Sequence, residues 1–342
     1  MKRLINLKTK SKYVTVIFFI GLTIVSLSCA DKLLCVKSAH GILQAREMYI
    51  QPENSIDVVF MGSSHIHCDV NTALLWEDYG IAAYDYSAAE QPLWITYYYL
   101  KEICKYQSPK LVVLDLYSPA RYKNNYQYGW LRDNLLGVKF SFNKLQMLYV
   151  GCEPKYYFDY FPNFAMYHNR YPTSEDIEYL FASKEDRASF KGYTPYYIES
   201  PQSEPELVEN RSGGITIKSE QYLQKIIEYT QEKDIELYLI VSPYITTSED
   251  ELVYNRIKEI ADSYGLEFNS TNYSYEEMGL DFDTDFTDES HLNYKGSCKY
   301  TQYLGAEIKE NYDIPDRRGL EKWESWDRHA EEIRAAAEEY GF

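Results

Sequence analysis

The sequence is short of positive charge. It has 35 Lys and Arg residues against 52 Asp and Glu residues, which gives a formal net charge of -17 at pH 7. Five of the basic residues lie within the first twelve positions, so the rest of the chain is more acidic still. An acidic surface repels phosphate backbones, which excludes nucleic acid as a partner and disfavours polyanionic substrates. Neutral glycans and small acyl compounds are not excluded.

Cysteine is also sparse, with six in 342 residues. Cys29 and Cys35 lie in or beside an apolar N-terminal stretch, and the other four are widely spaced. This spacing fits neither a zinc ribbon nor a disulfide-dense miniprotein, so we expect isolated buried cysteines. The sequence also lacks internal repeats and low-complexity tracts.

Acidic residues are absent before Asp31, where a basic flank precedes an uncharged apolar stretch from Tyr13 to Ala30. This stretch has about the minimum length of a transmembrane helix, and the positive-inside rule places the body outside the cytoplasm. We predict a membrane anchor or signal segment over residues 1–30, followed by a connecting stalk over residues 31–54. An uncleaved single-pass anchor in the cell membrane is favoured, because the apolar character continues at residues 33–36.

Two other interpretations of the leader stay open. It could be a cleaved signal peptide, or the stretch SLSCA could be a lipoprotein cleavage site at Cys29. All three interpretations export the rest of the chain.

Apolar runs alternate with amphipathic segments over most of the remaining chain. Runs typical of strands occupy residues 55–61, 81–87, 110–118, 235–243 and 266–270. Patterns typical of helices occupy residues 72–79, 92–107, 219–234 and 248–265, and one more begins near Asn293. The first strand is almost continuously apolar, as in a parallel sheet that is buried on both faces. The alternation predicts a three-layer α/β sandwich with a mostly parallel central sheet.

We place this α/β domain at residues 55–312. It contains an insertion over residues 119–214 that is rich in Tyr, Phe and Asn. Such a long connection is usually a lid or a small subdomain. Its aromatic side chains could form a platform for sugar rings or could simply pack onto the sheet. Residues 313–342 form an amphipathic helix that we expect to dock on the domain.

Two short motifs could carry chemistry. A turn of sequence Gly-Ser-Ser-His, residues 62–65, follows the first strand, and reactive sites lie beyond the carboxyl ends of parallel strands. Near the other end of the chain, Asp288 precedes His291 by three residues. A carboxylate at that spacing can accept a hydrogen bond from the imidazole and leave its other nitrogen free as a base. This arrangement suits a serine nucleophile.

These motifs and the α/β order between them resemble the SGNH/GDSL hydrolase superfamily over roughly residues 55–310. The resemblance implies a flavodoxin-like fold without a cofactor. It also implies that Ser64, rather than Ser63, is the nucleophile, that His291 is general base and then general acid, and that Asp288 orients His291. Asp285 is the second choice for this orienting role.

The oxyanion hole of the superfamily departs from its usual pattern here. The second sequence block commonly reads Asn-x-Ser-x-x-Gly, and Asp85, Ser87 and Glu90 stand at those spacings. Backbone N–H groups of Ser64, Ala89 and Glu90 are therefore the expected donors. The third block, usually Gly-x-Asn-Asp, has no counterpart after residues 110–118. Losing one oxyanion donor can lower a rate by roughly a hundredfold, unless another residue replaces it.

Membrane-anchored extracytoplasmic members with similar motifs are associated with acylation of envelope polysaccharides. By this resemblance we expect a serine esterase or acyltransferase that acts on small acyl esters, above all acetyl esters, of cell-envelope glycans. The expected partners are an acylated glycan or small ester, the membrane through the N-terminal helix and, for a transferase, a membrane protein that supplies the acyl group.

Two other functions stay open. A catalytically inactive relative could bind or assemble glycans through the aromatic insertion. A metal-dependent hydrolase could use His65 and His67 together with Cys68 or Asp69, but a closed site needs more ligands, so we expect no metal.

The acidic run around Asp288 does not fit a calcium loop, because Phe286 and Leu292 stand where the template requires Gly and Glu. No role is assigned to His40, His168 or His329.

Overall fold

The computed structural model describes residues 2–206 and 213–342, with side chains from Lys12 onward. The chain forms two compact units. One contains Met1–Lys37 and Phe158–Ala182, and the other contains Ser38–Tyr157 and Ser183–Phe342.

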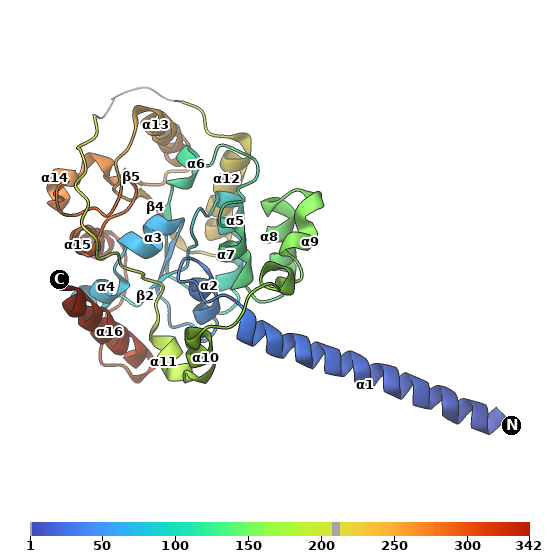
Figure 1. Cartoon of the computed structure of the whole chain (residues 1–342). Coiled ribbons are helices and arrows are strands. Elements are labelled where there is room, and N and C mark those ends of the chain that lie inside the picture. Colours follow the sequence, from blue (N-terminus) through green and yellow to red (C-terminus); the bar gives the residue numbers. More distant parts are fainter. Residues whose placement is uncertain (1, 207–212) are drawn as a thin grey trace. The chain divides into compact units, whose positions relative to one another are not determined.

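The larger unit is built on a five-stranded parallel sheet in the order β2-β1-β3-β4-β5. Figure 1 labels β2, β4 and β5 among the helices that surround them. The strands are β1 (Val58–Met61), β2 (Ala83–Asp85), β3 (Leu111–Asp115), β4 (Glu236–Val241) and β5 (Phe268–Ser270). In the central strand pairs, Val58 is in register with Ala83 on one side and Leu111 on the other. The predicted α/β class is confirmed, and every strand pair in the sheet is parallel.

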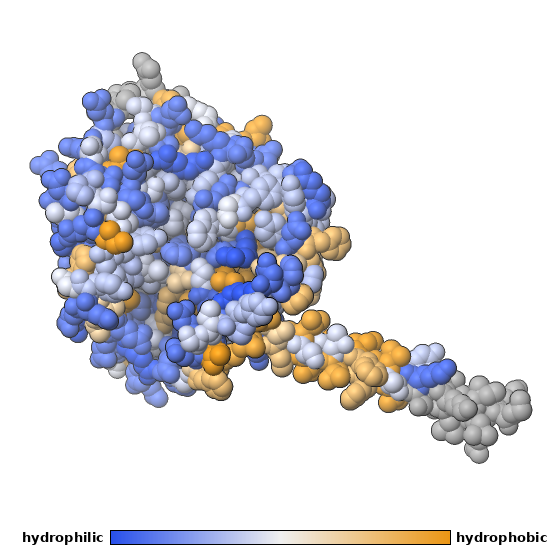
Figure 2. Space-filling model, in the orientation of Figure 1, coloured by the Kyte–Doolittle hydropathy of each residue, from blue (hydrophilic) through white to orange (hydrophobic). Residues whose placement is uncertain are grey.

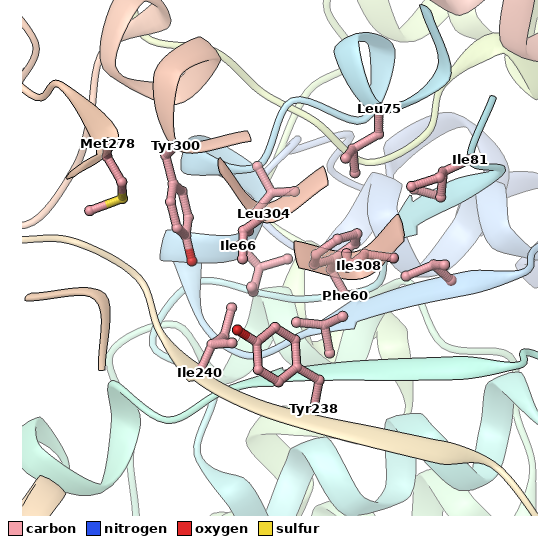
Figure 3. Close-up of a cluster of buried hydrophobic side chains, with 14 of the residues drawn as sticks. Phe60, Ile66, Leu75, Ile81, Tyr238, Ile240, Met278, Tyr300, Leu304 and Ile308 are labelled. Atoms are coloured by element: carbon pink, nitrogen blue, oxygen red, sulfur yellow. The ribbon is translucent and has the colours of Figure 1, made fainter. Parts of the chain in front are cut away.

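Helices flank this sheet. The connections between its strands contain α4 (Thr72–Tyr79), α5 (Leu93–Ile103), α12 (Ile217–Glu232) and α13 (Ser248–Ser263), and α15 (Tyr294–Asn311) follows β5. Leu304 and Ile308 of α15 and Leu75 of α4 pack with Phe60 and Tyr238 of the sheet in one buried cluster (Figure 3). Because side chains alternate along a strand, this cluster covers one face, and the neighbouring residues of each strand face the opposite layer.

Local sequence signals set where these helices begin. The side chain of Asn71 accepts hydrogen bonds from the N–H groups of Ala73 and Leu74, which caps α4. Asn293 caps α15 in the same way. Pro92 directly precedes α5 as its N-cap residue.

Short helices complete the α/β unit. They are α2 (Ile42–Met48), α3 (Ser64–Asp69), α6 (Ser118–Arg121), α7 (Leu131–Leu136), α8 (Phe142–Gly151), η1 (Pro154–Tyr156), α11 (Lys184–Ser189), η3 (Thr271–Tyr273) and α14 (Tyr275–Met278). The stalk expected over residues 31–54 needs correction, because the chain belongs to this unit from Ser38 onward. The buried side chain of Gln44 on α2, for example, donates to the carbonyl of Gly192 at 2.9 Å.

The C-terminal segment packs on the same unit through η4 (Glu321–Trp323) and α16 (Glu324–Tyr340). Trp326 of α16 is fully buried, and its indole N–H donates to the carbonyl of Ala83 in β2 at 3.1 Å. The buried side-chain nitrogen of Lys191 lies 3.6 Å from the centre of a Trp326 ring and donates to Oγ of Ser325 on α16 at 2.7 Å. Burial and hydrogen bonds therefore both hold α16 in place.

The smaller unit contains α1 (Lys2–Leu34), η2 (Asn163–Met166) and α10 (Ser174–Phe181), and α9 (Tyr157–Tyr160) lies at its boundary. Lys12–Leu34 is long and apolar enough to cross a membrane, although a signal sequence would have the same properties (Figure 2). Arg170 donates to the carbonyl of Leu34 at 2.9 Å and pairs with Asp176 of α10 at 2.6 Å. Part of the aromatic insertion therefore packs with the first helix.

Replacing the buried indole of Trp326 tests the docking of α16. We expect Trp326→Ala to lower the free energy of unfolding by about 3 to 5 kcal/mol, because it leaves a cavity and removes a hydrogen bond. Denaturant unfolding measures this change, and Glu331→Ala on the exposed side of α16 is the control. Equal stability of the two variants would contradict a packed C-terminal helix.

Candidate active site

The first motif forms a sharp turn between β1 and α3. Gly62 has φ of +151°, and a Cβ atom there would lie 2.9 Å from Cβ of Asp115 on β3. Only glycine tolerates both this backbone conformation and this close approach. The turn makes Ser64 the first residue of α3. Ser63 is fully buried, whereas Ser64 lines a pocket, so the structure presents Ser64 and not Ser63.

The structure brings Ser64, His291 and Asp288 together in one chain of hydrogen bonds. Nδ1 of His291 lies 3.0 Å from Oδ1 of Asp288, which also accepts the N–H groups of Ser290 and His291. With Nδ1 donating to this carboxylate, Nε2 carries the lone pair. Nε2 lies 2.8 Å from Oγ of Ser64 and can accept its proton.

The charge of Asp288 suits an orienting role. Partial burial raises its pKa, but the hydrogen bond and charge of His291 and two backbone N–H groups outweigh burial and hold the pKa below its usual value. The carboxylate is therefore ionised at neutral pH. Its side chain is 55% exposed, so water screens the pair and fixing the imidazole tautomer is its main contribution.

The loop that carries His291 is tied directly to the helix that carries Ser64. A side-chain oxygen of the buried Asp69 on α3 accepts the N–H of Leu292 at 3.0 Å. Phe286 and Leu292 form an antiparallel bridge, and the N–H of Asn293 donates to the carbonyl of Asp285. The proposed nucleophile and base thus lie on segments that share hydrogen bonds.

Asp285, the second choice for orienting His291, is engaged elsewhere. It is buried and pairs with Nζ of Lys299 at 2.5 Å, and it accepts the N–H of Asp281 at 2.7 Å. Its carboxylate holds the start of the loop to α15, so this alternative assignment is not supported.

The expected oxyanion segment forms a tight turn in which the N–H of Gln91 donates to the carbonyl of Ala88. Glu90 occupies the third position with φ of +48°, where glycine is usual. The N–H of Ala89 donates to the carbonyl of His40 at 2.9 Å, so the expectation that Ala89 is an oxyanion donor needs correction. Within the described residues, the N–H groups of Glu90 and Ser64 have no hydrogen-bond partner.

Ser64 opens into a pocket of about 260 Å³. The other lining residues come from segments far apart in the sequence: His40, Ala89, Glu90, Tyr117, Tyr122, Trp130, Tyr196, Ser290 and His291. Four of them are Tyr or Trp, and three of these, Tyr122, Trp130 and Tyr196, belong to the insertion over residues 119–214. The pocket can therefore hold a small group beside Ser64 against walls that combine aromatic and polar side chains.

His65 packs beneath this pocket. It is fully buried, its ring centre lies 3.7 Å from that of Tyr117, and within the described residues neither ring nitrogen has a hydrogen-bond partner. Burial holds its pKa well below the usual value, so the ring is neutral. A packing role accounts for His65.

The partners of His67 are not those that the metal-site hypothesis requires. Its Nδ1 lies 2.9 Å from Oγ of Ser87, and its Nε2 lies 3.3 Å from Nδ1 of His40. In the described part of the chain, the ligand-type atoms that cluster within 4.8 Å belong to His40, His67 and Cys68. Neither His65 nor Asp69 joins this cluster, so the structure does not assemble the ligand set of the metal-dependent alternative.

Sequence reasoning missed several lining residues. His40 has no matched partner in the sequence that would indicate a role, and single aromatic residues carry no motif. The other two unassigned histidines lie outside the pocket. His329 is buried and bonds to Thr72, and His168 lies exposed in the smaller unit.

Relief of the backbone strain at Glu90 tests the oxyanion turn. We expect Glu90→Gly to raise the free energy of unfolding by about 1 kcal/mol, because glycine adopts positive φ without steric cost. Turnover per folded molecule should be retained, because the backbone N–H remains. Thermal unfolding measures the change in stability. Asp234→Gly, at a residue with φ of +56° outside the pocket, is the matched control. A loss of stability at Glu90 alone would show that its side chain outweighs the strain.

No protein-family model matches the sequence, and no curated protein matches it. A similar solved structure is a Bacteroides fragilis NCTC 9343 protein described as a "putative acylhydrolase", with 14% identity and a TM-score of 0.39. The match covers 78% of this chain and 94% of that one. Similarity at this level carries no inference about activity, which rests on the site itself.

Proposed function

We propose that this protein is a serine esterase or acyltransferase that acts on small acyl esters. The observation that carries the proposal is the hydrogen-bonded chain from Asp288 through His291 to Ser64, which ends in a pocket. A hydroxyl, a base and an orienting carboxylate in this order are the requirements of nucleophilic acyl transfer.

In the first half of the reaction, Oγ of Ser64 attacks the ester carbonyl while Nε2 of His291 takes the hydroxyl proton. The carbonyl electron pair moves onto oxygen, where the free N–H groups of Ser64 and Glu90 are suitable donors. Collapse of this intermediate breaks the ester bond. The departing alcohol takes the proton from His291, and the acyl group stays on Ser64.

In the second half, water or an acceptor hydroxyl attacks the acyl-serine, and His291 again accepts and returns the proton. Water gives hydrolysis, and a second alcohol gives acyl transfer. The same residues serve both outcomes, so the acceptor that reaches the pocket decides between them.

The pocket favours a short acyl chain on an uncharged carrier. A volume of about 260 Å³ suits an acetyl or similar group together with part of its carrier. Sugar rings present apolar faces to aromatic side chains, as Tyr122 and Trp130 could provide. Together with the acidic composition and the resemblance of the motifs, these walls support acylated envelope glycans as the substrate class.

Location follows from the first helix. If Lys12–Leu34 spans the cell membrane, its basic flank keeps the N-terminus in the cytoplasm and places the α/β unit outside, beside the envelope glycans. A transferase at this position would receive its acyl group from a membrane protein.

A fluorophosphonate probe tests the nucleophile. We expect residues 1–342 in detergent to be phosphonylated at Oγ of Ser64 with loss of fluoride, as located by peptide mass spectrometry. Labelling should disappear in Ser64→Ala and His291→Ala, and fall at least tenfold in Asp288→Asn, because an amide can donate to Nδ1 and favour the wrong tautomer.

Asp283→Asn changes an exposed carboxylate of the same loop and is the matched control, which should label like the wild type. Labelling of another serine, or undiminished labelling without His291, would refute the triad.

One observation favours a second candidate, a glycan-binding protein without turnover. The N–H of Ala89 is already hydrogen-bonded and Glu90 replaces the usual glycine, and both features weigh against turnover. The aromatic side chains of the pocket could bind a glycan without any catalysis. This candidate predicts that Ser64→Ala leaves the affinity for acetylated oligosaccharides unchanged and that Trp130→Ala lowers it at least tenfold, as measured by calorimetry. Turnover of those oligosaccharides by the wild type would refute it.

A further inference from the structure

Three side chains form a hydrogen-bonded row that ends in the pocket. Oγ of Ser87 lies 2.9 Å from Nδ1 of His67, and Nε2 of His67 lies 3.3 Å from Nδ1 of His40. Ser87 and His67 are fully buried, and His40 lines the pocket beside Ser64. The row is separate from the chain that joins Asp288 to Ser64.

The direction of the row follows from the Ser87 hydroxyl, which has one hydrogen to donate and two lone pairs. Within the described residues, His67 is the hydrogen-bond partner found for this hydroxyl. If His67 donated to it, the hydroxyl proton would be left buried without an acceptor, which costs about 1 to 3 kcal/mol. A lone pair left over is tolerated more easily. Ser87 therefore donates to His67.

This direction fixes both imidazole tautomers. With Nδ1 of His67 accepting, its proton lies on Nε2 and is donated to Nδ1 of His40. Burial lowers the pKa of both histidines, so both rings are neutral at neutral pH. The proton of His40 must then lie on Nε2. Because Nε2 is across the ring from Nδ1, it faces away from His67.

The main chain also holds His40 at the oxyanion turn. Its carbonyl accepts the N–H of Ala89 at 2.9 Å, and Gly41 beside it has φ of +136°. A Cβ atom at Gly41 would lie 2.5 Å from Cβ of Ala88, so only glycine allows this approach. His40 is thus fixed to the wall that carries the Glu90 N–H.

We propose that Nε2–H of His40 donates a hydrogen bond to the carbonyl oxygen of the ester bound at Ser64, and that His67 and Ser87 hold His40 in the donor tautomer. The inference rests on the proposed function. As Oγ of Ser64 bonds to the carbonyl carbon, the electron pair moves to the oxygen and strengthens this hydrogen bond. His40 keeps its proton throughout, and His291 carries the proton that moves.

Two variants of His40 test this role in the full-length protein with p-nitrophenyl acetate as the probe. We expect His40→Phe, which keeps a ring but has no donor, to lower kcat roughly a hundredfold with little change in KM. His40→Gln restores an N–H donor and should recover at least tenfold of this loss. A His40→Phe variant with the kcat of the wild type would overturn the proposal.

His329→Phe is the matched control, because His329 is also buried and neutral but bonds to Thr72 and does not line the pocket. Its kcat per folded molecule, with the folded fraction taken from thermal unfolding, should equal that of the wild type. An equal loss of kcat in this control would assign the His40 effect to the fold and overturn the proposal.

Imidazole ¹⁵N chemical shifts test the tautomers without any turnover. We expect His40 and His67 each to show a protonated Nε2 and an unprotonated Nδ1 at pH 7. A protonated Nδ1 on His40, or an imidazolium, would overturn the proposal. Absence of Ser64 labelling in the wild type would instead refute the proposed function. The ¹⁵N shifts would still show which tautomers His40 and His67 adopt.

A metal ion is the competing explanation for the close nitrogens, since Sγ of Cys68 also lies within 4.8 Å of them. We expect kcat and the ¹⁵N shifts to be unchanged by EDTA and by added Zn²⁺. Metal-dependent kcat, or a zinc-induced shift of Nδ1 of His40 together with Nε2 of His67, would replace the proposed row with a metal site.

Discussion

The hydrogen bond from the N–H of Leu292 to the side-chain oxygen of Asp69 joins two segments that lie 223 residues apart in the chain. Asp69 closes the short helix that begins with Ser64, and Leu292 directly follows His291. The bond forms in the buried interior, where an unpaired N–H would be costly. It therefore helps to hold the proposed nucleophile Ser64 and the proposed base His291 at a fixed distance from each other.

The parallel sheet makes this meeting geometrically simple. All five strands point the same way, so the turn after β1, the turn after β2 and the segment after β3 reach one edge. Asp115 at the end of β3 accepts the N–H groups of Tyr117 and Ser242, which holds the ends of β3 and β4 together. Burial raises the pKa of Asp115 to about 6, so ionised Asp115 destabilises the fold. The two backbone hydrogen bonds reduce this destabilisation.

The sequence alone predicts those parts of the structure that depend on a local or periodic signal. Continuous apolar strands, capping residues such as Asn71 and Asn293, and the alternation of elements predicted the sheet and its main helices. The Gly62 turn and the three-residue spacing of Asp288 and His291 likewise indicated side chains that the structure brings together. These features depend on backbone rules that a single sequence expresses directly.

The remaining parts of the site depend on contacts between distant segments. His40 meets His67 where Gly41 lets its segment approach Ala88, and no local pattern in the sequence near His40 predicts this contact. Because these contacts have no local signal, the sequence predicts only a stalk over residues 31–54. The aromatic insertion is divided between the two units, although its composition is similar throughout. Trp130 belongs to the α/β unit, and Arg170 lies beside α1 in the smaller unit.

The turn at residues 88–91 keeps a backbone geometry that usually requires glycine, although Glu90 stands there. Glu90 holds a positive φ at a cost of about 1 to 2 kcal/mol, and its carboxylate is bonded to Gln127. Such strain persists only where surrounding contacts determine the conformation. Here those contacts include the Ala89–His40 bond, which uses one N–H that could have faced a substrate. The same bond brings His40 to the turn, so the contact that removes a backbone donor also supplies a side-chain donor in its place.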